Sequence, residues 1–182
     1  TMNEDESTQS LSDKVVDRAN VLKFGAPKNF ANSRLEGDAP EPQALSKTQW
    51  DKWVRKPEIL GSDEQFVNTK IDEMAVIMKS FGRPFGHRLR LAMKSYVANY
   101  PESDRYNGRK KIETALADQI ELRLLPKLRG LDPEESVVSQ AFGDLSNMIR
   151  QDLGDKDLAD AVQTSIANAG QNSQFNWGGV TR

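Results

Sequence analysis

Cysteine is absent from the 182-residue chain, and histidine occurs only once, as His87. The first absence excludes disulfides and thiol chemistry, and the second excludes a metal site built from several histidines. No apolar run approaches the roughly 20 residues that a membrane-spanning helix needs. The acidic first ten residues have neither the basic start nor the apolar run of a signal peptide. We therefore expect a cytoplasmic protein with no metal site and no membrane contact.

A strong excess of charge of either sign is also missing. The chain has 25 basic and 27 acidic residues, which gives a net charge of −2. A global basic character, which would favour nucleic acid as a partner, is therefore excluded, although local basic patches are not. With 37% apolar and 29% charged residues, the chain can bury one core of modest size.

Apolar residues recur at helical spacing along most of residues 62–168. The pattern predicts helices from Ser62 to about Met78 and over about 86–99, 109–129, 133–152 and 155–168. Ser62 and Gln65 have the spacing of a capping box, Pro126 should kink or shorten its helix, and Pro133 should lie in the first turn of the next. Because each apolar stripe is one-sided, these helices should pack on one another as a bundle.

The first 24 residues have a different pattern. A short helix is predicted over 13–18, and the β-type run "VLKF" at 21–24 predicts a strand directly after it. A lone strand has no partner within an otherwise helical chain, and even an isolated pair of strands is marginal in water. The strand is therefore expected to belong to a sheet whose other strands lie outside this chain.

Residues 25–61 contain four prolines and read as an irregular insertion or linker. Within them, "LSKTQWDKWV" predicts one short helix that starts at Ser46. Trp50 and Trp53 are three positions apart and should share a face of that helix, either docked on a neighbouring element or available to a partner. The tail after residue 170 should be loose, except where Phe175 and Trp177 anchor it.

The predicted fold class is therefore mainly α. A helical bundle over 62–170 follows a linker over 25–61, and a tail over 171–182 follows the bundle. Residues 1–24 form the helix–strand element, which the family resemblance given below implies to be the remnant of an α/β core.

Two local features could bind an anion. Arg18 lies at a predicted helix end, where its planar guanidinium could reach a phosphate, although a surface arginine that complements the helix dipole has the same pattern. Gly86, His87 and Arg88 open a predicted helix, where backbone N–H groups and a cation could meet an anion. The alternative there is a glycine turn with a structural histidine and a local salt bridge. No G-x-x-x-x-G-K-[ST] motif occurs in the chain, and the sequence gives no basis for a Ser-His-Asp arrangement.

Four segments together resemble the C-terminal half of an AAA+ ATPase of the McrB-like group, the NTP-driven motors of modification-dependent restriction and related defence systems. They are "TMNEDEST", "LSDKVVDRANVLKF", "PFGHRLRLAMKSYVANYP" and "ALADQIELRLLPKLRGLD". The closing "SQFNWGGVTR" is a fainter match to an aromatic C-terminal motif of such proteins. The combination of D-R-A-N-V with L-P-K-L-R-G is more specific than either motif alone.

The resemblance implies a role for several residues. Asn3 corresponds to the sensor-1 position and Arg18 to the arginine finger, while Arg88, with His87 and Gly86, lies at the nucleotide-binding second-sensor position of the helical lid. The complete protein would hydrolyse ATP or GTP with Mg²⁺ as a ring of identical copies, with a nuclease subunit and DNA as further partners. Because the Walker A and Walker B segments are missing from it, this chain is expected to be a fragment that binds no nucleotide alone and is inactive alone.

Two other function classes stay open. The chain could be a free-standing helical protein-binding module that uses Trp50 and Trp53, with no catalytic activity. It could also bind nucleic acid through the basic residues Lys110, Lys111, Lys127 and Arg129, although the net negative charge weighs against this hypothesis.

Overall fold

The computed structural model of the protein describes residues 13–16, 19–23, 44–54, 59, 61–102, 107–169 and 174–180. These residues are mainly helical, as the sequence predicts. The α-helices are α1 (Asp13–Val16), α2 (Lys47–Val54), α3 (Ser62–Ser80), α4 (His87–Asn99), α5 (Gly108–Gln119), α6 (Ser136–Asn147) and α7 (Lys156–Ala169). A π-helix, η1 (Ile120–Leu124), and a 3₁₀-helix, η2 (Leu125–Leu128), continue α5, and a second π-helix, η3 (Met148–Asp152), continues α6.

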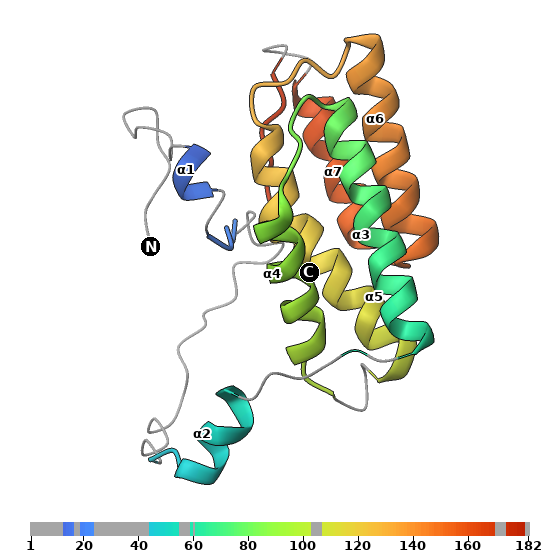
Figure 1. Ribbon diagram of the computed structural model, residues 1–182. Helices are drawn as coiled ribbons and strands as arrows, with labels where there is room; N and C mark the ends of the chain where they lie inside the picture. The colour runs from blue at the N-terminus through green and yellow to red at the C-terminus, as the bar shows by residue number, and fades with distance from the viewer. Residues whose placement is uncertain are drawn as a thin grey trace.

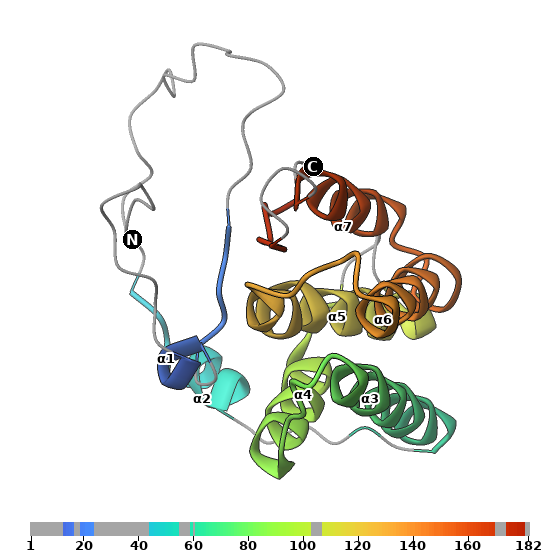
Figure 2. The same cartoon turned by 90° about the horizontal axis from the view of Figure 1, so that it is seen from above.

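Helices α3 to α7 form the expected bundle. Seen from above, α3 lies beside α4 in one layer, α5 beside α6 in the next, and α7 covers the far side (Figure 2). α3 also packs on α6 across the layers, and α4 packs on α5 (Figure 1). The one-sided apolar stripes read from the sequence are the surfaces that these contacts bury, because each stripe needs an apolar neighbour.

An aromatic cluster connects the end of α3, α6 and the C-terminal segment. The ring of Phe142 in α6 lies 4.7 Å from the ring of Phe81 and 4.7 Å from that of Phe175, measured between centroids. Two backbone hydrogen bonds hold the tail there: Gly130 N–H donates to the Phe175 carbonyl at 2.9 Å, and Phe175 N–H donates to the Leu131 carbonyl at 2.7 Å. Phe175 and Trp177 are almost fully buried, so the predicted anchors of the tail are confirmed.

The predicted capping box at Ser62 is wrong. The chain enters α3 through Gly61, whose φ of 65° leaves Ser62 already inside the helix, and no side chain among the described residues caps this end. A capping box does occur at α2, where the Ser46 hydroxyl accepts from Gln49 N–H at 3.2 Å and the Gln49 amide oxygen accepts from Ser46 N–H at 3.0 Å. That box confirms the predicted start of the short helix.

Pro133 does not lie in the first turn of α6, contrary to the prediction. The carboxylate of Asp132 accepts a hydrogen bond from Glu134 N–H at 2.9 Å, which makes a local turn around the proline. The helix therefore begins three residues after Pro133, at Ser136. Pro126 acts as predicted, because the chain changes from a π-helix to a 3₁₀-helix around it. The 3₁₀-helix ends at Leu128, two residues before Gly130, whose φ is 81°.

The predicted strand over 21–24 is wrong for residues 21–23. They form no strand, and no strand occurs elsewhere in the described ranges; Val180 is a single bridge residue. The β-type run at 21–23 makes a different contact, because Val21 donates its N–H to a helix carbonyl rather than to a neighbouring strand.

Candidate functional site

Residues 19–23 are held along the helix that contains Pro126. Val21 N–H donates to the carbonyl of Leu122 at 2.9 Å, and the Arg123 guanidinium donates from Nε to Oδ1 of Asn20 at 2.6 Å. A proline has no N–H, so Pro126 cannot donate to the carbonyl four residues before it, which is that of Leu122. The backbone of residue 21 uses this carbonyl, and α1 contacts η2 beside it.

The same segment also lies against the C-terminal residues 174–180. The Lys23 ammonium donates to Oδ1 of Asn176 at 3.2 Å. Gly179 has a φ of 85°, and a Cβ atom built there would be only 2.5 Å from the Lys23 carbonyl oxygen. Only glycine therefore permits this close approach of the two backbones.

Replacing Gly179 with alanine should separate these two segments. The new methyl group would overlap a backbone oxygen that cannot rotate away, so we expect a loss of about 1–3 kcal/mol of stability, measured by urea denaturation. Gly82→Ala is the matched control: its φ is 67°, but nothing lies within 4 Å of the place that its Cβ would take. Equal losses in the two variants would show that the contact with Lys23 adds nothing.

Asp17 and Arg18, with Asn3, lie outside the described residues. Their neighbours are described on both sides: α1 ends at Val16, and Ala19 N–H donates to the Val15 carbonyl at 3.1 Å. The position of Arg18 in the chain is therefore between α1 and a segment that is hydrogen-bonded to the bundle.

Gly86, His87 and Arg88 lie together at the start of α4, where the sequence placed a helix end. Gly86 is the N-cap residue in an extended conformation, and its carbonyl accepts from Leu89 N–H and Arg90 N–H at 3.1 and 3.3 Å. No described side chain caps this end, and all three residues are exposed. The first N–H groups of a helix have no partner within the helix, so this end offers donors and a positive dipole to an anion.

Arg88 differs from the next arginine of α4. Arg90 reaches α3 and forms an ion pair with Asp72; the hydrogen bond from its guanidinium holds the pKa of the Asp72 carboxyl below its usual value. Arg88 has no such ion pair among the described residues. Of the two arginines, Arg88 is therefore the one whose guanidinium could bind a ligand. The local salt bridge considered for Arg88 is formed by Arg90 instead.

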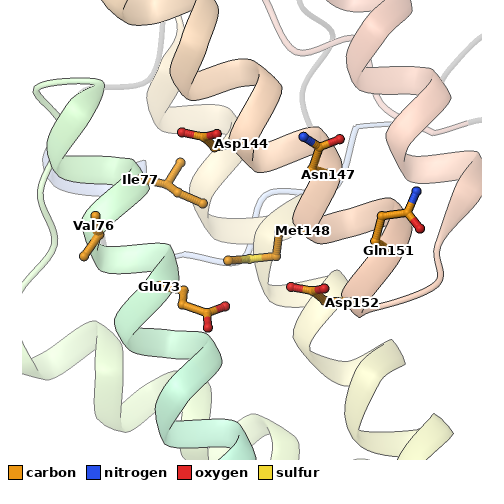
Figure 3. A pocket seen from close by; sticks show the side chains of 8 residues that line it. All are labelled: Glu73, Val76, Ile77, Asp144, Asn147, Met148, Gln151 and Asp152. Carbon is orange, nitrogen blue, oxygen red and sulfur yellow. The ribbon is translucent and has the colours of Figure 1, made fainter.

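A groove of 390 Å³ lies between α3 and the end of α6 (Figure 3). Its lining consists of Glu73, Val76, Ile77, Asp144, Asn147, Met148, Gln151 and Asp152. Lys70 donates to Glu73 and to Asp152 at 2.7 Å each. Burial lowers the pKa of Lys70, but the hydrogen bonds to Asp152 and Glu73 together with the negative charges of these two carboxylates raise it by more, so the net pKa lies above its usual value. Asp144 has no ion pair in the described part of the chain.

Other potential sites have less structural support. Within the described ranges, no group of three or more histidine, aspartate or glutamate side chains could hold a metal ion. The helices seen there also lack the combination of length and apolar character needed to cross a bilayer. Two lysines of the suggested basic patch are engaged within the bundle, because Lys111 pairs with Glu102 at 3.3 Å and Lys110 donates to the Leu153 carbonyl at 3.5 Å.

Sequence reasoning did not find the contact between residues 19–23 and η1, or the groove. For the first, a signal exists: a proline inside a helical pattern leaves a carbonyl four residues earlier without its usual donor. For the groove there is no comparable signal, because its lining comes from helices about 70 residues apart in the chain.

One family model matches the sequence over residues 44–168, with the description "Domain of unknown function (DUF8727)". The chain belongs to this family. The DUF8727 region begins just before α2 and ends within α7, so it includes the groove and the start of α4 but not α1 or residues 19–23. Neither a curated protein nor a solved structure matches the chain.

Proposed function

We propose that the chain is the C-terminal part of an oligomeric AAA+ NTPase motor of the McrB-like restriction and defence type. Bundle α3–α7 serves as its helical lid. The complete protein binds ATP or GTP with Mg²⁺ between neighbouring copies, and this chain supplies Arg18, Asn3 and Arg88 to those sites. A nuclease subunit and DNA are the further partners that this function implies.

The main support is the contact between residues 19–23 and η1. "D-R-A-N-V" and "L-P-K-L-R-G", the two motifs whose combination is most specific in the resemblance, are about 100 residues apart in the chain. Asn20 and Val21 of the first motif bond to Arg123 and Leu122, which lie two and three residues before the second. Such a connection would transmit movement of the lid to the segment that carries Arg18, as a rigid-body switch requires.

The start of α4 gives separate support. Its exposed N–H groups and the exposed Arg88 provide donors suited to phosphate oxygens. In a motor of this type, contacts to the phosphates at this position would link the state of the nucleotide to the orientation of the lid.

Substitution of Arg88 tests this part of the proposal in the complete NTPase. Loss of a charge-assisted hydrogen bond costs about 1.5–3 kcal/mol, so Arg88→Ala should raise the Kd for nucleotide by roughly 10- to 100-fold, measured by equilibrium titration. Lys79→Ala, which removes an exposed cation from the last turn of α3, is the control and should leave the Kd unchanged. An unchanged Kd for Arg88→Ala would remove Arg88 from the nucleotide site.

The alternative function, a free-standing protein-binding module, is favoured by one observation. Trp50 is 55% exposed and α2 does not pack on the bundle, so the expected docking of Trp50 on a neighbouring element is not found. The side chain of Trp53, the other tryptophan of that prediction, lies outside what the structure describes. The two functions can be separated because a binding module would not change the rate of nucleotide hydrolysis by a Walker-bearing partner.

A further inference from the structure

We propose that residues 174–180 form a strap that fixes residues 19–23 to the bundle, with Gly179 and Asn176 as its positioning residues. The proposal rests on the proposed function in one respect, because the strap acts on the nucleotide site through Arg18, which directly precedes the fixed segment in the chain. The strap and the segment that it fixes consist entirely of described residues.

The strap is attached to the bundle at two places. Phe175 exchanges two backbone hydrogen bonds with the chain that follows η2: its N–H donates to the Leu131 carbonyl at 2.7 Å, and its carbonyl accepts from Gly130 N–H at 2.9 Å. Three residues further on, Gly178 N–H donates to the hydroxyl of Ser165 in α7 at 3.3 Å. The strap therefore bridges the end of the α5–η2 helix and α7.

Buried and exposed side chains alternate along the strap. Phe175 and Trp177 are buried in the core, whereas Asn176 between them is exposed and accepts a hydrogen bond from the Lys23 ammonium at 3.2 Å. Gly179 brings the two backbones together, because a Cβ atom there would lie only 2.5 Å from the Lys23 carbonyl oxygen. One side of the strap thus contacts the bundle and the other contacts the segment that contains Lys23 (Figure 2).

Residues 19–23 are consequently held on two sides. Asn20 and Val21 bond to η1, and Lys23 bonds to the strap. Single hydrogen bonds at a protein surface add little to stability, so the contacts with η1 alone would allow this segment to open locally. A catalytic group that is misplaced by about 1 Å loses roughly 100-fold in rate, so a second line of contacts suits a segment that positions Arg18.

Hydrogen exchange of the Val21 amide in the isolated chain tests the strap directly. This N–H is protected by the Leu122 carbonyl only while the segment is docked. Gly179→Ala should accelerate its exchange by about tenfold or more, because the new methyl group pushes the strap and the segment apart. Gly82→Ala is the matched control, since its φ of 67° imposes similar backbone strain but its Cβ meets nothing within 4 Å. Equal exchange rates in the two variants would overturn the proposal.

Substitutions of Asn176 test the hydrogen bond itself by the same measurement. Asn176→Ala should accelerate exchange of the Val21 amide by about two- to tenfold. Asn176→Asp keeps an oxygen that accepts from Lys23 and should exchange no faster than the wild type. Gln174→Ala removes an exposed side-chain amide from the same strap and should match the wild type. An unchanged rate in Asn176→Ala would remove Asn176 from the positioning residues.

The positioning role is tested in the complete NTPase. Gly179→Ala should lower kcat by roughly 10- to 100-fold and leave the KM for nucleotide unchanged, because the arginine acts on the transferred phosphoryl group rather than on binding. A strap that is merely structural would affect stability and leave kcat at the level of Gly82→Ala. Normal kcat in Gly179→Ala, with the Val21 amide released and Arg18→Ala impaired, would overturn the positioning role. If Arg18→Ala itself has normal turnover, the proposed function fails, and exchange of the Val21 amide still decides whether the strap fixes the segment.

Discussion

Replacing Arg18 with alanine should lower nucleotide hydrolysis by the complete NTPase by about a thousandfold while nucleotide binding is retained. In the proposed site, this guanidinium crosses from one copy to the nucleotide of the next and stabilises charge on the transferred phosphoryl group. Arginine fingers contribute roughly 10³- to 10⁵-fold to the rate of such reactions. The measurement is the steady-state hydrolysis rate of the assembled protein, together with its nucleotide Kd.

Arg18→Lys is the informative companion variant. Lysine keeps the charge but lacks the planar pair of donors, so only part of the rate should return. If turnover is unchanged in Arg18→Ala, Arg18 is a surface residue that complements the dipole of its helix, which is the alternative that the sequence also allows.

Replacing Phe142 with alanine should reduce the free energy of unfolding by about 3–5 kcal/mol. Phe142 is 2% exposed, and its ring lies between those of Phe81 and Phe175. Its removal leaves a cavity where α6, the end of α3 and the C-terminal segment meet. Urea denaturation, with the midpoint and slope fitted together, measures the loss.

Val137→Ala on the same helix is the control for Phe142→Ala. Val137 is 56% exposed, so its truncation should change stability by about 0.5 kcal/mol or less. A loss below about 1 kcal/mol for Phe142→Ala would mean that the C-terminal segment is not held by this cluster.

The bundle could be predicted from the sequence because its helices are amphipathic and its apolar residues recur with the helical period. Helix ends were less predictable, since they depend on a single residue's conformation. Ser62 has the sequence pattern of a capping residue, but the positive φ of Gly61 moves it into the helix. At Pro133, a local turn made by the Asp132 carboxylate delays the start of α6.

The predicted strand shows what a local pattern omits. The β-type run at 21–23 indicates an extended chain, but it does not say which group will accept the hydrogen bonds of that chain. The acceptor is the Leu122 carbonyl, about 100 residues away, and it is open to Val21 because Pro126 has no N–H to donate. Only the tertiary contact shows that Val21 bonds to a helix and not to a sheet.

The candidate site was predictable in part. Gly86, His87 and Arg88 lie at the start of a helix, as the sequence predicts. The role of Arg88 stays a prediction, which the nucleotide titration tests. Which arginine is paired was not predictable, because the partner of Arg90 lies on α3. The groove was beyond sequence reasoning, since Val76 becomes an exposed edge only when α3 and α6 are packed together.

The most direct test of the proposed function is to combine this chain with the Walker-bearing half that the proposal requires and to measure hydrolysis of ATP and GTP. The proposed function predicts that neither piece hydrolyses nucleotide appreciably alone, and that adding this chain restores turnover in a manner that depends on Arg18. If the Walker-bearing half has the same rate with and without the chain, or if no such half exists, the chain does not complete a nucleotide site.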